Sequence, residues 1–219
     1  MSAETDRDAV KARLNEARAL LEESSYAEAE SLLAPLDQEL NLAGFVSAET
    51  AYLRAWVRMG AASLEFRQGA IAEASTLLGD ALDRVKTSLR LDAGSSDAQA
   101  LQEAVRSELY KAVSHFASLG QDRDALAFYD TLRCREFASG EETHVTAASC
   151  LHRLGQIDDA QRVLEAILTL APRSRAAWTA LSEVAKKIGD AELEESCELE
   201  LSTLEPFALP RLLPELKKL

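Results

Sequence analysis

The chain has 219 residues, of which 47% are apolar and only 5% are aromatic. This length allows one or two domains with their own cores, and the few aromatic, glycine and proline residues argue against an all-β protein. The net charge of −13 opposes binding to nucleic acid or insertion at an anionic membrane face, because phosphate groups repel such a surface.

Apolar residues recur at helical spacing along nearly the whole chain, with short breaks between the periodic segments. The pattern predicts ten helices, near residues 4–23, 25–40, 48–68, 71–90, 97–119, 122–137, 141–154, 157–171, 175–188 and 190–203. Ser25, which precedes Glu28, and Ser47 are placed to cap free N–H groups at two helix starts. The segment 92–98, DAGSSDA, is the clearest loop. The sequence therefore predicts an all-α protein.

Glycines recur at the turns between neighbouring helices, each followed five residues later by an alanine. The pairs are Gly69 with Ala74, Gly120 with Ala125 and Gly155 with Ala160; Ser24 with Ala29 is a weaker version, and Gly189 has Glu194 in the alanine's place. A glycine at a helix C-terminus accepts a positive φ and lets the chain reverse in few residues. The alanine is expected where the two antiparallel helices come closest, because a larger side chain would hold them apart. Pro172 and Pro206 are expected to stop two of the second helices.

This pattern resembles the tetratricopeptide repeat (TPR), a 34-residue helix–turn–helix unit. The matching residues are Leu151, Gly155, Ala160, Leu164, Ile167 and Pro172 in 141–174; Trp178, Leu181, Gly189 and Pro206 in 175–208; and Phe116, Gly120, Ala125 and Tyr129 in 106–140. The match is weaker before residue 106, since Gly69 and Gly120 are 51 residues apart. The resemblance implies a right-handed α-solenoid over 1–208, with about five helix pairs near 4–40, 48–90, 97–140, 141–174 and 175–208.

The C-terminal tail, residues 209–219, carries leucines at amphipathic spacing. We expect a short helix that caps the last repeat, since the end of a repeat stack needs a cover. Docking of this tail into a partner or a neighbouring copy of the chain is the alternative.

No motif for phosphate binding, zinc-dependent hydrolysis or a serine nucleophile is present. The three cysteines, Cys134, Cys150 and Cys197, are too few and too far apart for a disulfide framework, and we expect reduced thiols. Together with the three histidines they form no metal-ligand spacing. We therefore expect a chain that is not an enzyme and that has no metal or cofactor.

TPR-like stacks line a concave groove with the first helix of each pair. The predicted first helices hold 13 Lys and Arg against 14 Asp and Glu, and the second helices hold 7 against 20. This bias is explained either by a low-charge groove that accepts peptides or by solubilising charge on the outer helices. The family's groove positions, and Trp56 near the same face, give the partner-binding candidates Trp56, Tyr110, Lys111, Ser114, Thr146, Ser149, His152, Arg153, Thr179, Glu183, Lys186 and Lys187. Among them, Arg153, Lys186 and Lys187 are the expected receivers of a carboxylate.

The resemblance implies a non-catalytic adaptor or scaffold, or a chaperone for one client, that binds a peptide segment or helix of a partner protein in its groove. The lysine and asparagine clamp of TPR co-chaperones is not present as a set, since Ser114, Ser149 and Glu183 occupy three of its positions. A structural module that forms homo-oligomers through its ends or tail is the alternative. No apolar signal segment or membrane-spanning run is found, so we expect a cytoplasmic protein without direct membrane insertion.

Overall fold

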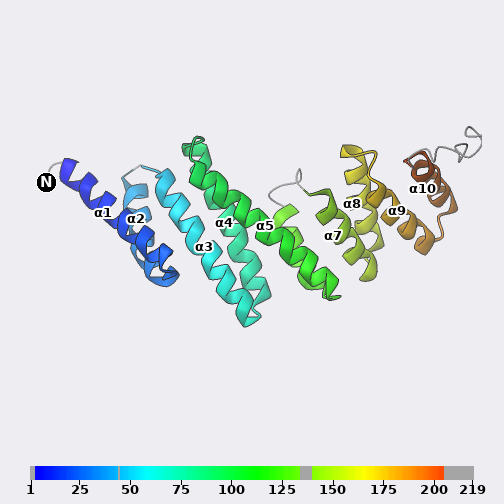
Figure 1. The fold of residues 1–219 in the computed structure, drawn as a ribbon, viewed down its shortest axis with the longest axis horizontal. Helices are drawn as coiled ribbons and strands as arrows, with labels where there is room; N and C mark the ends of the chain where they lie inside the picture. The colour runs from blue at the N-terminus through cyan, green and yellow to red at the C-terminus, as the bar shows by residue number, and fades with distance from the viewer. Residues whose placement is uncertain (1–2, 44, 134–139, 205–219) are drawn as a thin grey trace, which may run out of the picture. The chain divides into compact units, whose positions relative to one another are not determined.

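The computed structural model of the chain describes residues 3–43, 45–133 and 140–204 (Figure 1). These residues form ten α-helices and no strand: α1 Ala3–Glu22, α2 Tyr26–Leu42, α3 Ala48–Gln68, α4 Ile71–Leu91, α5 Ser96–Ser118, α6 Asp122–Arg133, α7 Glu141–Arg153, α8 Ile157–Leu170, α9 Arg175–Ile188 and α10 Ala191–Leu204. The all-α prediction is confirmed, and the predicted helix bounds agree within two residues wherever the ends are described. The predicted end of the sixth helix, near 137, lies outside the described residues.

Each odd-numbered helix pairs with the helix that follows it in antiparallel fashion (Figure 1). We call α1, α3, α5, α7 and α9 the first helices, and their partners the second helices. The described residues divide into two compact units, unit 1 within 1–139 and unit 2 within 140–219. In unit 1, α3 packs along α4 and also touches α1 and α5; in unit 2, α9 packs on α10 and touches α7 and α8. The division into five repeats of one solenoid stays a prediction.

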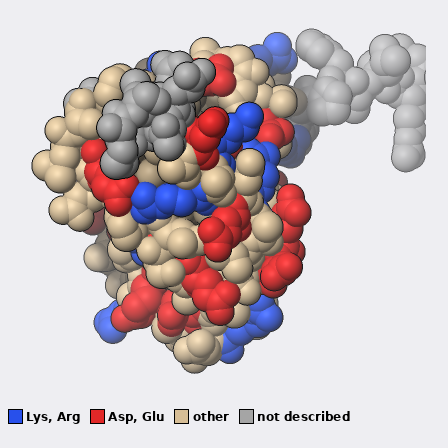
Figure 2. All heavy atoms as spheres, turned by 90° about the vertical axis from the view of Figure 1, so that its left-hand side faces the viewer, with Lys and Arg blue, Asp and Glu red and all other residues tan. Residues whose placement is uncertain are grey.

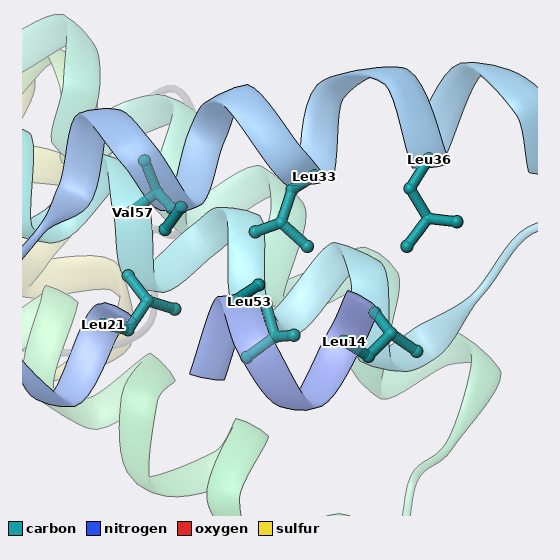
Figure 3. Close-up of a cluster of buried hydrophobic side chains, with 8 residues drawn as sticks. Leu14, Leu21, Leu33, Leu36, Leu53 and Val57 are labelled. Carbon is teal, nitrogen blue, oxygen red and sulfur yellow. The ribbon is translucent and has the colours of Figure 1, made fainter. Parts of the chain in front are cut away.

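The N-terminal core of unit 1 is built by leucines and one valine from three helices (Figure 3). The large side chains are Leu14 and Leu21 from α1, Leu33 and Leu36 from α2, and Leu53 and Val57 from α3. Each is at most 6% exposed, and burial of such a side chain contributes about 1.5–3 kcal/mol. One helix pair alone leaves this apolar face open, so α1 and α2 depend on α3 to complete their core.

The glycine turns have the predicted conformation. Gly69, Gly120, Gly155 and Gly189 have φ between 73° and 80°. The residue after each glycine donates its N–H to a carbonyl five positions earlier, for example Gln156 N to Leu151 O at 2.9 Å. This bond satisfies a carbonyl at the helix end and closes the reversal. Ser24 is at the equivalent place in the first pair and has φ 63°, the only non-glycine with positive φ among the described residues.

The alanines that follow these turns are buried, as the close approach of paired helices requires. Ala29, Ala74, Ala125 and Ala160 are at most 1% exposed. The last pair departs from the pattern because Glu194 stands in this position. Its carboxylate is 3.5 Å from Lys186 Nζ, at the rim of the pair instead of between the helices.

Serine caps begin three of the helices. Ser47, Ser95 and Ser174 accept hydrogen bonds from the N–H groups of Thr50, Ala98 and Ala177, at 3.2, 3.2 and 3.0 Å. The predicted cap at Ser25 is wrong, since its side chain accepts no such bond. The physical reason is backbone conformation: Ser25 follows the left-handed Ser24 and has ψ 61°, whereas the capping serines are extended.

Gly60 provides a close helix contact that the sequence pattern does not reveal. It lies inside α3, against the ring of Tyr26 at the start of α2, and a Cβ atom at this position would stand 2.0 Å from Tyr26 Cε1. Because any side chain would displace that ring, the glycine lets α2 and α3 approach.

Several predictions fall on residues outside the described ranges: Pro206, Cys134 and the capping helix at 209–219. Pro172 follows the end of α8 at Leu170, as predicted. Within the described helices, none combines the length and apolar character needed to cross a bilayer.

Candidate partner-binding grooves

An open groove of about 540 Å³ lies between the first helices of unit 2. Its lining residues are Val145 and Ser149 from α7, with Arg175, Ala176, Thr179, Ala180 and Glu183 from α9. Most of these side chains are small, so a partner backbone can approach both helices closely. The lining includes one basic and one acidic residue, which gives the groove no net charge.

Hydrogen bonds at both ends hold α9 against α7. At one end, Ser174 Oγ accepts from Ala177 N and pairs with Glu141 Oε1. At the other end, Lys187 Nζ donates to the carbonyl of His152 at 2.9 Å. A cation is favourable there because the last carbonyls of a helix carry partial negative charge. The spacing of the two groove walls is therefore fixed by side chains outside the groove.

The predicted site residues of unit 2 have different positions. Ser149, Thr179 and Glu183 line the groove, whereas Thr146 is half-buried and donates its hydroxyl to Glu142 O. The three basic residues that are predicted to bind a carboxylate each contact a different group of this chain. Arg153 Nη2 is 3.3 Å from Cys150 Sγ, Lys187 binds the carbonyl of His152, and Lys186 lies near the carboxylates of Glu194 and Glu198 on α10.

A second groove, of about 380 Å³, lies in unit 1 between α3 and α5, with α4 beneath. It is lined by Ala62, Ser63, Phe66, Ala74, Leu78, Glu108, Lys111, Ala112 and His115. Its apolar surface is contributed mainly by α3 and α4. On α5, Lys111 Nζ binds Glu108 Oε1 at 2.9 Å, so one wall carries a neutralised ion pair.

Three phenylalanines support this groove from below. Phe116 and Phe128 are stacked, with ring centroids 5.6 Å apart and an interplanar angle of 6°. Phe66 packs at an angle on both rings and remains 38% exposed. Aromatic pairs of this kind restrict one another's orientation, so Phe66 presents a fixed apolar edge to the groove.

Of the predicted site residues in unit 1, only Lys111 lines this groove. Tyr110 and Ser114 are not among its lining residues, and Trp56 packs on Tyr52, at 6.2 Å between ring centroids, and on the N-terminal core. The lining of α5 comes instead from positions 108, 111, 112 and 115.

An arginine links the three first helices of unit 1. Arg18 of α1 is 3.2 Å from Glu49 of α3 and 3.9 Å from Asp97 of α5, and its guanidinium lies 6.0 Å from the Tyr52 ring centroid. Burial, followed by the charge of Asp97, raises the pKa of the Tyr52 hydroxyl. This side of the first helices therefore presents paired charges, with one negative charge in excess, beside Trp56.

Charge is divided between the two kinds of helix. With the observed bounds, the first helices hold 13 Lys and Arg against 13 Asp and Glu, and the second helices hold 6 against 18. Figure 2 looks from the N-terminal side of Figure 1 and shows many acidic side chains over the lower part of that face, with basic ones in a band across its middle and at its lower edge. Both grooves thus lie between first helices, which carry no net charge when all five are taken together.

Within the described part of the chain, no three His, Cys, Asp or Glu side chains come together as a possible metal site. Cys150 and Cys197 are buried and form no disulfide bond within the described residues. Burial raises the pKa of the Cys197 thiol, which disfavours the reactive thiolate.

Comparisons with known proteins agree with the repeat seen in unit 2. The tetratricopeptide repeat family model matches residues 141–184, a segment that contains every lining residue of the unit 2 groove. Residues 141–184 therefore contain a tetratricopeptide repeat, and repeats of this class mediate protein–protein interactions.

Solved structures with a similar helical arrangement are distant. MamA AMB-1 in a P212121 crystal is 13% identical, with a TM-score of 0.41 over 95% of this chain and 98% of that chain. The TPR domain of P58(IPK) is 18% identical, with a TM-score of 0.37 over 98% of this chain and 68% of that chain. No curated protein sequence is similar enough to count as a relative.

Proposed function

We propose that the chain is a non-catalytic adaptor or scaffold, or a chaperone for one client, that binds an extended segment or a helix of a partner protein along its first helices. The observation that carries this proposal is the groove between α7 and α9, which lies entirely within the segment matched as a TPR. The grooves are the surfaces where small or apolar side chains gather between first helices, which as a set carry no net charge.

The unit 2 groove suits a peptide backbone better than a small charged molecule. Ala176 and Ala180 form an apolar strip along α9, and Ser149 and Thr179 have hydroxyls bound to carbonyls of their own helices. Arg175 and Glu183, at the two ends of the α9 lining, supply one charge of each sign. A partner with a short apolar stretch between opposite charges would complement this arrangement.

Filling the groove tests the proposal. Thr179→Trp places a large ring on the exposed groove wall of α9 and should reduce capture of the partner at least tenfold, since it occupies the partner's space. Thr169→Trp is the matched control: it is an equally exposed threonine on second helix α8, and its hydroxyl also donates to a carbonyl four residues earlier. Affinity capture with quantitative mass spectrometry measures both, with circular dichroism to check folding. Equal loss with both variants, or no loss with Thr179→Trp, refutes binding in this groove.

A further inference from the structure

A cluster of arginines lies on the opposite side of α3 from the aromatic surface of the first helices. Residues two apart on a helix point about 200° apart, so Arg54 and Arg58 face away from Tyr52 and Trp56. They lie half-buried on the side of α3 where the second helices α2 and α4 pack. Arg84 of α4 is also half-buried, and its electrostatic neighbours are Arg54, Arg58, Glu30 and Asp37.

Two carboxylates from α2 pair with two of these arginines. Arg54 Nη2 donates to Glu30 Oε1 at 2.8 Å, Arg54 Nη1 donates to Asp37 Oδ2, and Arg58 Nη2 donates to the same Glu30 oxygen at 3.0 Å. Both carboxylates thus already bind guanidinium groups. No hydrogen bond or ion pair of Arg84 to another described residue is found, and the cluster holds three positive charges against two negative ones.

These arginines and carboxylates face the space between α2 and α4, which we call the α2–α4 seam. The backbones of the two helices do not come close to each other there. Among the described residues, no Cα atom of α2 lies within 8 Å of a Cα atom of α4. The neighbouring seam is different, because α4 and α6 pack directly and Ser75 Oγ donates to Ala127 O at 3.0 Å. Long charged side chains therefore cross the α2–α4 seam, whereas the hydroxyl-bearing side chains of Ser75 and Thr131 lie in the α4–α6 seam.

Two donors and one acceptor in this seam lack a hydrogen-bond partner. They are the buried Nε atoms of Arg54 and Arg58 and the Oε2 atom of Glu30. Burial and the two neighbouring guanidinium groups lower the pKa of Arg84. The charged form of Arg84 is therefore less stable here than in water. Groups with perturbed pKa values cluster at functional sites, and here the perturbed arginine stands beside two others at an open seam.

We propose that Arg84, with Arg54 and Arg58, binds one carboxylate presented by an acidic side chain or a chain terminus of a partner protein at the seam between α2 and α4. The guanidinium fork matches a carboxylate in two parallel hydrogen bonds. A monoanion neutralises the surplus charge of the cluster, whereas a phosphate dianion leaves an excess negative charge in a half-buried place. Helix α2 carries four acidic and no basic residues, whereas the charges of α4 balance. The arginine cluster is therefore the point in this seam where an acidic partner group is attracted. The site is separate from the first-helix grooves.

The proposal predicts opposite effects of Arg84 on stability and on binding. Arg84→Met keeps an apolar stem and removes the unpaired charge, so it should raise the melting temperature by about 2 °C. The same variant should lose the response to acetate, the simplest carboxylate probe. In the unaltered chain, acetate at matched ionic strength should shift the arginine side-chain N–H signals of Arg84, Arg54 and Arg58 in NMR spectra, while chloride should not. Arg90→Met, an exposed arginine of the same helix, is the control and should leave both properties unchanged.

Each other outcome overturns the proposal. If Arg84 instead pairs with Glu30 in solution, Arg84→Met lowers the melting temperature and acetate produces no shift. Inorganic phosphate that binds more tightly than acetate at the same ionic strength refutes the carboxylate assignment. Because the groove variant Thr179→Trp leaves this cluster intact, its acetate response should be normal whether or not the grooves bind a partner.

Discussion

Replacing Arg54 with methionine should lower the free energy of unfolding by about 3 kcal/mol, because it leaves two carboxylates of α2 without their main partner. The Arg54 side chain is only 13% exposed, and it joins Glu30 and Asp37 to α3. Burial alone lowers the pKa of Arg54, but its hydrogen bonds and ion pairs to these carboxylates raise it overall. The charged form is thus strongly favoured in the folded chain.

Urea denaturation followed by circular dichroism measures this effect. Arg58→Met is the control and should cost less, since Arg58 is 26% exposed and shares a carboxylate that Arg54 already binds. The double variant Arg54→Met with Asp37→Asn should recover part of the loss, because it removes the stranded charge. If Arg54→Met lowers the free energy of unfolding by less than about 1 kcal/mol, the network contributes no more than an ordinary surface ion pair. That result would contradict its role in joining α2 to α3.

Replacing Ala160 with leucine should lower the free energy of unfolding by about 2–3 kcal/mol, since it adds carbon atoms to a closed contact between α7 and α8. Ala160 is 0% exposed, five residues after the turn glycine Gly155. The expected result is a lower urea midpoint with the helix content retained until unfolding.

The last helix pair supplies a matched control for this substitution. Glu194 occupies the same position relative to Gly189, and its side chain is 33% exposed at the rim. Glu194→Leu should therefore change stability by less than about 1 kcal/mol. Equal losses at positions 160 and 194 would show that the alanine position does not set the approach of paired helices.

The helices and turns could be predicted from sequence because their determinants are local. Gly155 and Ala160 need only their own helix pair to explain them, and the same spacing recurs at three other turns. The predicted cap at Ser25 is wrong because a cap depends on backbone conformation, and Ser25 directly follows Ser24, which takes the left-handed conformation of the turn. Sequence periodicity fixes which residues face inward, but it does not fix unusual local backbone angles.

The grooves were only partly predictable. In unit 2 the repeat length is regular, and the transferred positions Ser149, Thr179 and Glu183 are groove-lining residues. In α5, Glu108, Lys111 and His115 line the groove, whereas Tyr110 and Ser114 lie outside its lining. Partner binding by Tyr110 and Ser114 stays a prediction. The contact of Gly60 with Tyr26 and the arginine cluster join residues from different helix pairs, and a single sequence gives no signal for such long-range partners.

The most direct test of the central claim, that partners bind along the first helices, is site-specific photocrosslinking in cells. A photoreactive amino acid would replace Ser63 or Thr179 in the grooves, and Thr76 or Thr169 on exposed positions of the second helices. We expect one partner protein to be crosslinked from Ser63, from Thr179 or from both, and not from the two second-helix positions. Crosslinks to that partner from Thr76 or Thr169 alone would contradict the account.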